Sequence, residues 1–345
     1  MLLKIKKRVD REIKSYINNI NRLHSLSKIS PVLFKTIKNF ISRKGKRIRP
    51  ILFIIAYLGF VKKAASGLYR SAISAELLHD FMLAHDDIID KSETRRGSPS
   101  MHTVLNRYLS GHKNIKFNGQ DLAIVVGDVM FAMAMHAFLS INEEKQRKED
   151  ALRRLLDAAL YTGSGEFIEL LNGIKNINKV TRKDIYRIYD LKTANYSFAS
   201  PLAIGSTLAG ANKDKVNRLF KYGVYLGRAF QVKDDILGLF AEDKITGKSN
   251  LTDLKEGKKT LLIWYAYQHA GQKEKALIKK TLSKRKVNNK DLSQIQKIVV
   301  NTGSLDYARK EINNLIQKAK KLNALLGMRP QYKKFLLNYS QEVLN

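Results

Sequence analysis

Apolar residues recur along most of this chain at steps of three or four, which is the spacing of one face of an α-helix. No stretch shows the sustained alternation of apolar and polar residues that marks a half-buried strand. Only five prolines interrupt the 345 residues, so long helices are permitted almost everywhere. The pattern therefore predicts an all-α protein. Its two clearest helical stripes consist of Ile73, Leu77, Phe81, Ala84 and Ile88, and of Val216, Leu219, Phe220, Val224 and Phe230.

Residues 122–141 form a long apolar run, which by length alone is sufficient to span a bilayer. Asp128 and His136 interrupt this run, which favours the buried central helix of a large bundle over a membrane span. The N-terminal residues MLLKIKKRVDREIK lack the extended apolar core and the cleavage signal of a secretory peptide. We therefore expect a cytoplasmic protein.

The chain is strongly basic. It has 63 Lys and Arg residues against 31 Asp and Glu residues, a formal charge of +32, and 44% of its residues are hydrophobic. This charge indicates a polyanionic partner: nucleic acid, an anionic membrane surface or a diphosphate ligand. Cysteine is absent, which excludes disulfides, thiolate zinc sites and cysteine nucleophiles. No repeat or break in composition marks a second domain, so we expect one domain over residues 1–345, with surface connections at 111–119, 142–150 and 242–259.

The segment HDDIID at residues 85–90 lies inside the first helical stripe. Residues four apart share one face of an α-helix, so Asp86 and Asp90 project together. Asp87 lies beside them, and His79 returns to nearly the same face. Carboxylates this close repel each other unless a cation lies between them, and oxygen ligands with open positions suit Mg²⁺ shared with substrate phosphates. A solvated acidic face is the alternative interpretation of this motif taken alone.

A second acidic pair, Asp234 and Asp235, follows the other helical stripe, with Gln231 on the same face. Basic residues accompany both acidic motifs, and Arg and Lys side chains bind phosphate oxygens. One of them lies in a helix that we expect to begin with a cap formed by Thr181 and Asp184. This arrangement favours a diphosphate site with a metal. The basic residues and their polar neighbour are Lys46, Arg47 and Arg49 in GKRIRP, Arg95 and Arg96 in RRG, Lys192 beside Thr193, Lys248, and Lys258 in GKKT.

With these motifs in this order, the chain resembles the trans-isoprenyl diphosphate synthases of the polyprenyl synthetase family, and especially the geranylgeranyl and farnesyl diphosphate synthases. The resemblance is carried by residues from about Lys44 to Thr260, and the flanks are helical and basic. It rests on GKRIRP at 45–50, HxxxxxxDDxxD at 79–90, RRGxPxxH at 95–102, GD at 127–128, KT at 192–193, FQxxDD at 230–235 and GKxxxxDLxxGKKT at 247–260.

The resemblance implies the isoprenoid synthase fold, in which antiparallel helices surround a deep central cavity, usually in a homodimer. It implies condensation of isopentenyl diphosphate with an allylic diphosphate by ionisation, condensation and elimination, with three Mg²⁺ ions bound together with the diphosphate. Asp86, Asp90 and Asp234 would ligate Mg²⁺, with Asp87 and Asp235 in support. The allylic substrate would contact Arg95, Lys192, Thr193, Gln231, Lys248 and Lys258. Isopentenyl diphosphate would contact Lys46, Arg49, His79 and Arg96, and Arg47 is counted with the substrate-binding residues.

The expected product is geranylgeranyl diphosphate (C20), with farnesyl diphosphate (C15) as the alternative. With a helical rise of about 1.5 Å per residue, Met82, Phe81 and Leu78 lie roughly 6, 7.5 and 12 Å below the first acidic motif. By the family resemblance Phe81 takes the position of the cavity floor, so its bulk should stop growth at medium length. Gly238 departs from the family pattern, because many members have a third aspartate there. The charge of +32 exceeds what substrate binding needs, and we hypothesise weak association with anionic membranes.

Three other protein classes are weighed against this interpretation. A terpene cyclase would normally replace Asp234 and Asp235 with an Asn/Ser/Glu metal site and would lack GKRIRP and RRG. A non-catalytic subunit of a heteromeric synthase commonly loses Asp-rich residues that are intact here. A nucleic-acid-binding protein would use the basic segments, but no recognised motif or aromatic platform accompanies them, so we expect no specific nucleic-acid partner.

Overall fold

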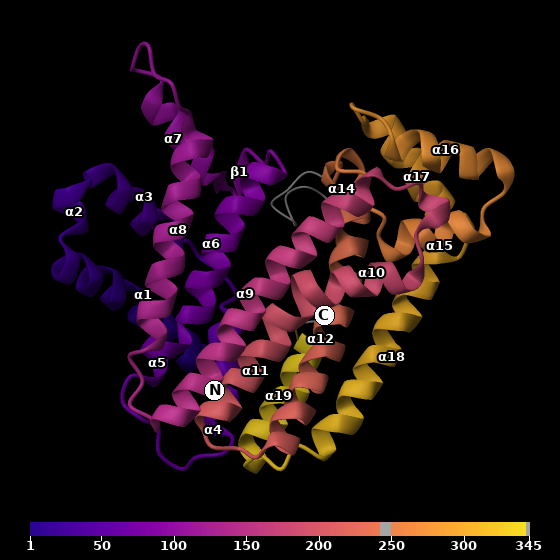
Figure 1. Cartoon of the computed structure of the whole chain (residues 1–345). Helices are drawn as coiled ribbons and strands as arrows, with labels where there is room; N and C mark the ends of the chain where they lie inside the picture. The colour runs from indigo at the N-terminus through magenta and orange to yellow at the C-terminus, as the bar shows by residue number, and fades with distance from the viewer. Residues whose placement is uncertain (242–249, 343–345) are drawn as a thin grey trace. The chain divides into compact units, whose positions relative to one another are not determined.

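The computed structural model describes residues 1–241 and 250–342, and most of these residues are helical (Figure 1). The all-α prediction is confirmed. Within the described residues the only strands are β1 (Thr94–Arg95) and β2 (Ser98–Pro99), which pair antiparallel. Arg96 and Gly97 form the turn between them, with positive φ angles of 54° and 69°. A hairpin with two-residue strands is too short to leave an alternating pattern, which is why the hydrophobic pattern did not predict it.

The described residues pack into two compact units. Unit 1 is drawn from residues 1–155 and 204–211, and unit 2 from residues 156–203 and 212–345. Each unit buries an apolar core, and each carries part of the predicted site.

Unit 1 is organised around helix α8, which packs along α6 and α7 (Figure 1). Large buried side chains such as Tyr16, Phe53 and Phe138 fill its core. Its helices are α1 (Leu2–His24), α2 (Leu26–Ile29), α3 (Pro31–Ile41), α4 (Ile48–Leu58), α5 (Leu68–Ala72), α6 (Ser74–Ile89), α7 (Met101–Leu109), α8 (Gly119–Phe138), the start of α9 (Lys145–Ile174) and most of α11 (Ser200–Leu208).

Helix α8 is the apolar segment that was long enough to span a bilayer. Asn118 and Asp121 form a capping box that fixes its N-terminus. Among the described residues it is the one helix whose length and composition would allow it to cross a membrane, and 44% of its apolar window is buried. Val126 and Met130 lie on the face packed within unit 1, whereas Ile124 is exposed. We predicted a helix buried on all sides, but α8 is buried on one face and exposed on the other.

The predicted connections differ in outcome. Residues 111–118 are exposed and lie outside the helices, as expected. Residues 145–150 belong to α9, so the expectation of a connection over 142–150 was wrong for most of that segment. Its Lys, Glu, Gln and Arg residues are good helix formers, and their charge marks a solvent-facing turn of helix. Of the third predicted connection, residues 242–249 lie outside the described residues, and the remainder contains the four-residue helix α14 (Thr252–Lys255).

Unit 2 is organised around α12 (Lys213–Phe240), which packs along α18 (Ser304–Ala324) and along η2 (Asp190–Ala199), a π-helical segment (Figure 1). Gly227 permits the close approach to η2, because a Cβ atom there would lie 2.4 Å from the Cα atom of Ala194. The other helices of this unit are the remainder of α9, η1 (Ile177–Lys179), α10 (Arg182–Tyr189), α14 (Thr252–Lys255), α15 (Leu261–His269), α16 (Gln272–Leu282), α17 (Asn289–Asn301) and α19 (Pro330–Glu342).

Candidate active site

The first acidic motif lies at the C-terminal end of α6. Asp86 and Asp87 occupy its last turn, and Asp90 caps it by donating its backbone N–H to the carbonyl of Asp86 at 2.8 Å. The last turn has no basic residue. Negative side chains at the C-terminus of a helix are disfavoured by the helix dipole, so this cluster requires cations from elsewhere.

Arg95 of the hairpin supplies one such cation. Its Nε donates to Oδ1 of Asp87 at 2.6 Å, and its Nη2 donates to Oδ2 of Asp86 at 2.8 Å. Burial alone would lower the pKa of Arg95, but Asp87 and Asp86 outweigh it and raise that pKa. The guanidinium therefore stays charged and ties β1 to the end of α6.

Arg43 is a functional neighbour that the sequence analysis missed. Its Nη2 donates to the carbonyl of Pro99 at 2.7 Å, and its Nη1 donates to the carbonyl of Arg95 at 3.4 Å. These bonds hold both strands of the hairpin, so Arg43 orients Arg95 indirectly. Its position two residues before GKRIRP was the available signal, but nothing in the spacing distinguished it from the other basic residues.

The predicted residues for isopentenyl diphosphate fall in unit 1 with differing environments. His79 is buried, and burial together with the charges of Arg49 and Arg96 lowers its pKa well below the ordinary value. His79 is therefore neutral at physiological pH and can act as a hydrogen-bonding group. Lys46 is exposed. Arg96 lies 3.7 Å from the buried carboxylate of Asp80.

Arg47 differs from its neighbours because it faces the interior and is only 3% exposed. Its Nε and Nη1 bind Asp10 and Glu76, each at 2.9 Å, and its Nη2 donates to the backbone carbonyls of Ile41 and Arg43. These contacts commit the guanidinium to the packing of unit 1 and do not favour the substrate contact that we expected from the sequence.

The three residues predicted to limit chain length lie on α6 before the aspartates. Leu78 is buried, and Phe81 and Met82 are half-buried. The ring of Phe81 packs edge-on against Phe131 of α8, with centroids 5.4 Å apart, and against His85 at 4.7 Å. Two aromatic contacts restrict its rotation, so the ring of Phe81 is held in one position.

Gly127 of the predicted GD pair has a packing role. A Cβ atom at this position would lie 2.4 Å from Nε2 of His85, so any larger residue would displace the His85 ring from its place beside α8. His85 also contacts the carbonyl of Ile124 at 3.2 Å. The motif therefore supports the helix that carries the aspartates.

The second acidic motif lies in unit 2, where α12 packs against η2. Asp235 is buried, accepts a hydrogen bond from the hydroxyl of Tyr189, and accepts another from Nε2 of Gln231 at 2.9 Å. Thr193 donates to Oε1 of Gln231 at 2.6 Å. Burial raises the pKa of Asp235 well above the ordinary value, although the bonds from Tyr189 and Gln231 act in the opposite direction. The structure thus links Thr193, Gln231 and Asp235 in one chain of hydrogen bonds, beside Asp234.

The capping box of Thr181 and Asp184 opens α10 as predicted. Lys192 and Thr193, however, lie beyond that α-helix, in the π-helical turns of η2. The Nζ of Lys192 lies 2.6 Å from Glu166 and 2.5 Å from Glu169, both on α9. The sequence analysis missed these glutamates and Tyr189, although the spacing of three between the glutamates places them on one helix face.

The remaining predicted residues lie near α14. Lys258 lies 2.5 Å from Glu256 and 3.7 Å from Asp253. Lys248 lies outside the described residues. A Cβ atom on Gly238 would lie 2.6 Å from Oδ2 of Asp253, so this glycine makes room for the carboxylate of Asp253 beside the second motif. The second motif lacks the third aspartate of many family members, and the carboxylate of Asp253 lies next to the position where that side chain would begin.

The donor groups fit a hard divalent cation. Each unit presents a pair of carboxylates from one helix, Asp86 with Asp90 on α6 and Asp234 with Asp235 on α12. Carboxylate oxygens are the ligands that Mg²⁺ prefers, and nitrogen or sulfur ligands are not needed for it.

Comparisons with known proteins agree with these observations. The sequence model of the family described as polyprenyl synthetase matches residues 30–299. The geranylfarnesyl diphosphate synthase of Aeropyrum pernix is 32% identical over 87% of this chain and 89% of its own length. The geranylgeranyl diphosphate synthase of Saccharolobus solfataricus is 31% identical over 85% of this chain and 84% of its own.

The structural comparison gives the fold. The crystal structure of geranylgeranyl pyrophosphate synthase from Corynebacterium glutamicum, complexed with isoprenyl diphosphate and magnesium, has a TM-score of 0.90 and 24% sequence identity. The likeness covers 100% of this chain and 99% of that one. The predicted isoprenoid synthase fold is confirmed.

Proposed function

The chain belongs to the polyprenyl synthetase family and is a prenyltransferase, and from this premise we propose that it condenses isopentenyl diphosphate with an allylic diphosphate to give geranylgeranyl diphosphate (C20). The observation that carries the proposal is helix α6. It ends in three aspartates, two of which, Asp86 and Asp87, accept hydrogen bonds from Arg95, and it holds Phe81 against Phe131. One helix thus carries both a diphosphate site and a chain-length wall. Farnesyl diphosphate (C15) is the alternative product.

Members of this family depend on Mg²⁺. We propose three ions per active site, with Asp86, Asp90 and Asp234 as ligands and with Asp87 and Asp235 holding the ligand helices in position. The bound metal would supply the positive charge that stabilises the departing diphosphate. Asp87 and Asp235 suit the supporting role because both are buried and already accept hydrogen bonds.

The chain's own cations complete the diphosphate sites in this proposal. Arg95, Lys192 and Lys258 would bind the allylic diphosphate, helped by Thr193 and Gln231, and Lys248 would join them. Lys46, Arg49, His79 and Arg96 would hold isopentenyl diphosphate. The cations stabilise charge on the leaving group as the allylic C–O bond breaks. The double bond of isopentenyl diphosphate then attacks the allylic carbon, and the proton lost afterwards passes to the released diphosphate. We now assign Arg47 a structural role, since Asp10 and Glu76 occupy its guanidinium.

The activity is tested by incubating purified protein with Mg²⁺, labelled isopentenyl diphosphate and geranyl or farnesyl diphosphate. Label should enter a longer allylic diphosphate only when metal and starter are both present. Asp86→Asn should abolish incorporation, whereas Asp306→Asn, at an exposed position in unit 2, should retain it. Incorporation that is indifferent to Asp86→Asn contradicts the proposal.

We further propose that units 1 and 2 act together as one synthase domain, because the family match runs across both of them. A homodimer is supported by a row of exposed apolar side chains on α9, since such patches mark protein interfaces. Phe167→Glu with Leu170→Glu should yield monomers in analytical ultracentrifugation, and Leu325→Glu, also exposed, should not. The row consists of Leu156, Leu160, Phe167, Leu170, Leu171 and Ile174.

We propose a cytoplasmic location with weak attachment to anionic membranes, supported by the charge of +32. The protein should sediment with phosphatidylglycerol vesicles at low salt and dissociate at high salt. Binding that is absent, or that resists salt, argues against this attachment.

A further inference from the structure

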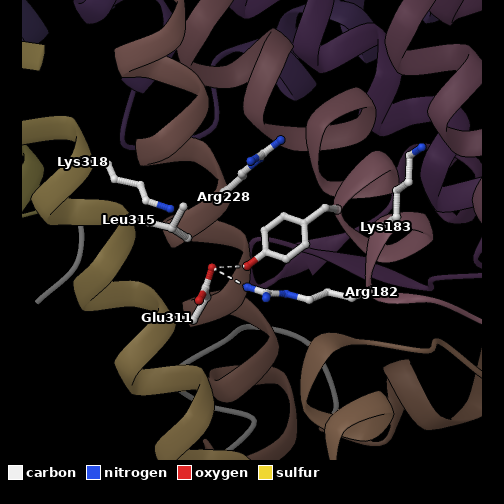
Figure 2. A pocket seen from close by; sticks show the side chains of 7 residues that line it. Arg182, Lys183, Arg228, Glu311, Leu315 and Lys318 are labelled. Carbon is white, nitrogen blue, oxygen red and sulfur yellow. Dashed lines mark hydrogen bonds and ion pairs between the residues drawn. The ribbon is translucent and has the colours of Figure 1, made fainter.

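A pocket lined mostly by charged side chains lies wholly within unit 2, and its lining residues belong to α10, α12 and α18 (Figure 2). Its volume is about 340 Å³. None of its residues belongs to the motifs assigned above. Four basic side chains dominate its lining, namely Arg182, Lys183, Arg228 and Lys318, together with Tyr186 and Glu311.

The two arginines already have carboxylate partners. Nη2 of Arg182 lies 3.0 Å from Oε1 of Glu311, which also accepts a hydrogen bond of 2.6 Å from Tyr186. Arg228 donates from Nε and Nη2 to the two oxygens of Asp190, both at 2.6 Å. Glu311, the single carboxylate in the pocket lining, is therefore already bound by Arg182 and Tyr186 and does not neutralise the lysines of the pocket.

The two lysines of the pocket, Lys183 and Lys318, have no carboxylate partner among the described residues. Figure 2 shows them on opposite sides of the pocket, with Arg228 and Arg182 between them. The pocket thus has an excess of two positive charges, to which the unused Nη1 of Arg228 adds hydrogen-bond donors.

Tyr186 makes the pocket rigid. The guanidinium carbons of Arg182 and Arg228 lie 5.2 and 5.1 Å from the centroid of its ring. Cation–π contacts of this kind fix the two arginines in addition to their ion pairs. A preformed set of cations binds an anion with less loss of side-chain entropy than flexible surface lysines do.

We propose that this pocket binds a phosphate-bearing anion. A phosphate or diphosphate group carries about two or more negative charges, which matches the excess of the two lysines, and arginine N–H groups bind phosphate oxygens in directed pairs. The anion comes either from free inorganic diphosphate or from the headgroup of an anionic lipid. This inference does not depend on the proposed function, because no residue of the pocket is assigned to catalysis.

The first test measures binding of inorganic diphosphate by calorimetry, at low salt and with EDTA so that no metal takes part. Lys183→Gln with Lys318→Gln should weaken binding by about tenfold or more. The control, Lys273→Gln with Lys290→Gln, removes the same charge from exposed lysines elsewhere in unit 2 and should change binding less than about twofold. Equal weakening in both double variants, or no effect of the first one, overturns the proposal. Lys183→Arg with Lys318→Arg should retain binding, and loss in that variant also overturns it.

The second test separates the two sources of phosphate. The same variants are sedimented with phosphatidylglycerol vesicles in the presence and absence of inorganic diphosphate. If vesicle binding falls only in the Lys183→Gln, Lys318→Gln variant, and if inorganic diphosphate displaces the vesicles, the ligand is the lipid headgroup. Vesicle binding that is equal in all variants overturns the lipid source and leaves free diphosphate as the ligand.

Discussion

Replacing Arg47 with methionine separates two roles for this residue that the sequence alone could not distinguish. The structure places its guanidinium between Asp10 and Glu76, with two further hydrogen bonds to backbone carbonyls. Methionine approximates the volume of the side chain but removes its charge and all five donors. The perturbation therefore leaves the core filled and removes only the polar contacts.

The magnitude follows from the burial of the partners. Glu76 is only 2% exposed, and its Oε2 has no hydrogen-bond partner among the described residues. Removing Arg47 leaves this carboxylate buried without a cation. Breaking a buried ion pair from one side costs about 3–5 kcal/mol, so Arg47→Met should lower the free energy of unfolding by that amount. Arg47→Met combined with Glu76→Leu should recover part of the loss, because no unpaired charge remains.

The assay is urea unfolding followed by circular dichroism, together with steady-state kinetics. Lys46→Met is the matched control, because Lys46 is the exposed neighbour. It should change stability by less than about 0.5 kcal/mol and raise the KM for isopentenyl diphosphate. A loss of less than about 1 kcal/mol of stability in Arg47→Met, together with a higher KM for isopentenyl diphosphate, would contradict the structural role of Arg47. That result would make Arg47 a substrate-binding residue.

Four further predictions concern the site and its supports. Asp90→Asn should lower kcat at least about a hundredfold, with an unchanged circular dichroism spectrum, because a charged oxygen ligand is lost; near-normal turnover would remove Asp90 from the ligands. Phe81→Ala should lengthen the product, measured by mass spectrometry after dephosphorylation, and an unchanged distribution would show that Phe81 is not the wall. Tyr189→Phe should cost about 1–3 kcal/mol of stability in urea unfolding, because Asp235 and the N–H of Leu261 both lose a buried partner, and a loss below that range would contradict the hydrogen-bond assignment. Although burial by itself would raise the pKa of Asp10, hydrogen bonds from Arg47 and Lys6 lower it below the ordinary value, so its stabilisation is complete above about pH 4 and is lost as the pH falls. Asp10→Asn should flatten the dependence of stability on pH below about pH 4, and an equally steep dependence would contradict the pairing.

The parts of the site that were predictable from the sequence are those fixed by local helix geometry. Asp86 and Asp90 share a face because they are four residues apart in one helix, whatever surrounds them. The same holds for Gln231 and Asp235, which are also four apart and hydrogen-bonded. The cap of α10 was predictable as well, because Thr181 and Asp184 are three residues apart.

What the sequence could not supply are contacts between residues far apart in the chain. Tyr189 reaches Asp235 across 46 positions, and Arg47 reaches Glu76 across 29. Of the basic residues in GKRIRP, Arg47 is the one that faces the interior, because Glu76 lies next to it in the folded unit. The helical pattern gives no information on that. Similarly, the π-helical geometry around Lys192, where η2 packs against α12, was not predictable, since the local sequence is compatible with an ordinary α-helix.

The most direct test of the account is the chain length of the product that purified protein makes from farnesyl diphosphate, isopentenyl diphosphate and Mg²⁺, determined by mass spectrometry. We predict a single C5 addition that gives geranylgeranyl diphosphate as the main product. A main product longer than C20, or the absence of any condensation product with intact Asp86, Asp90 and Asp234, would contradict this prediction.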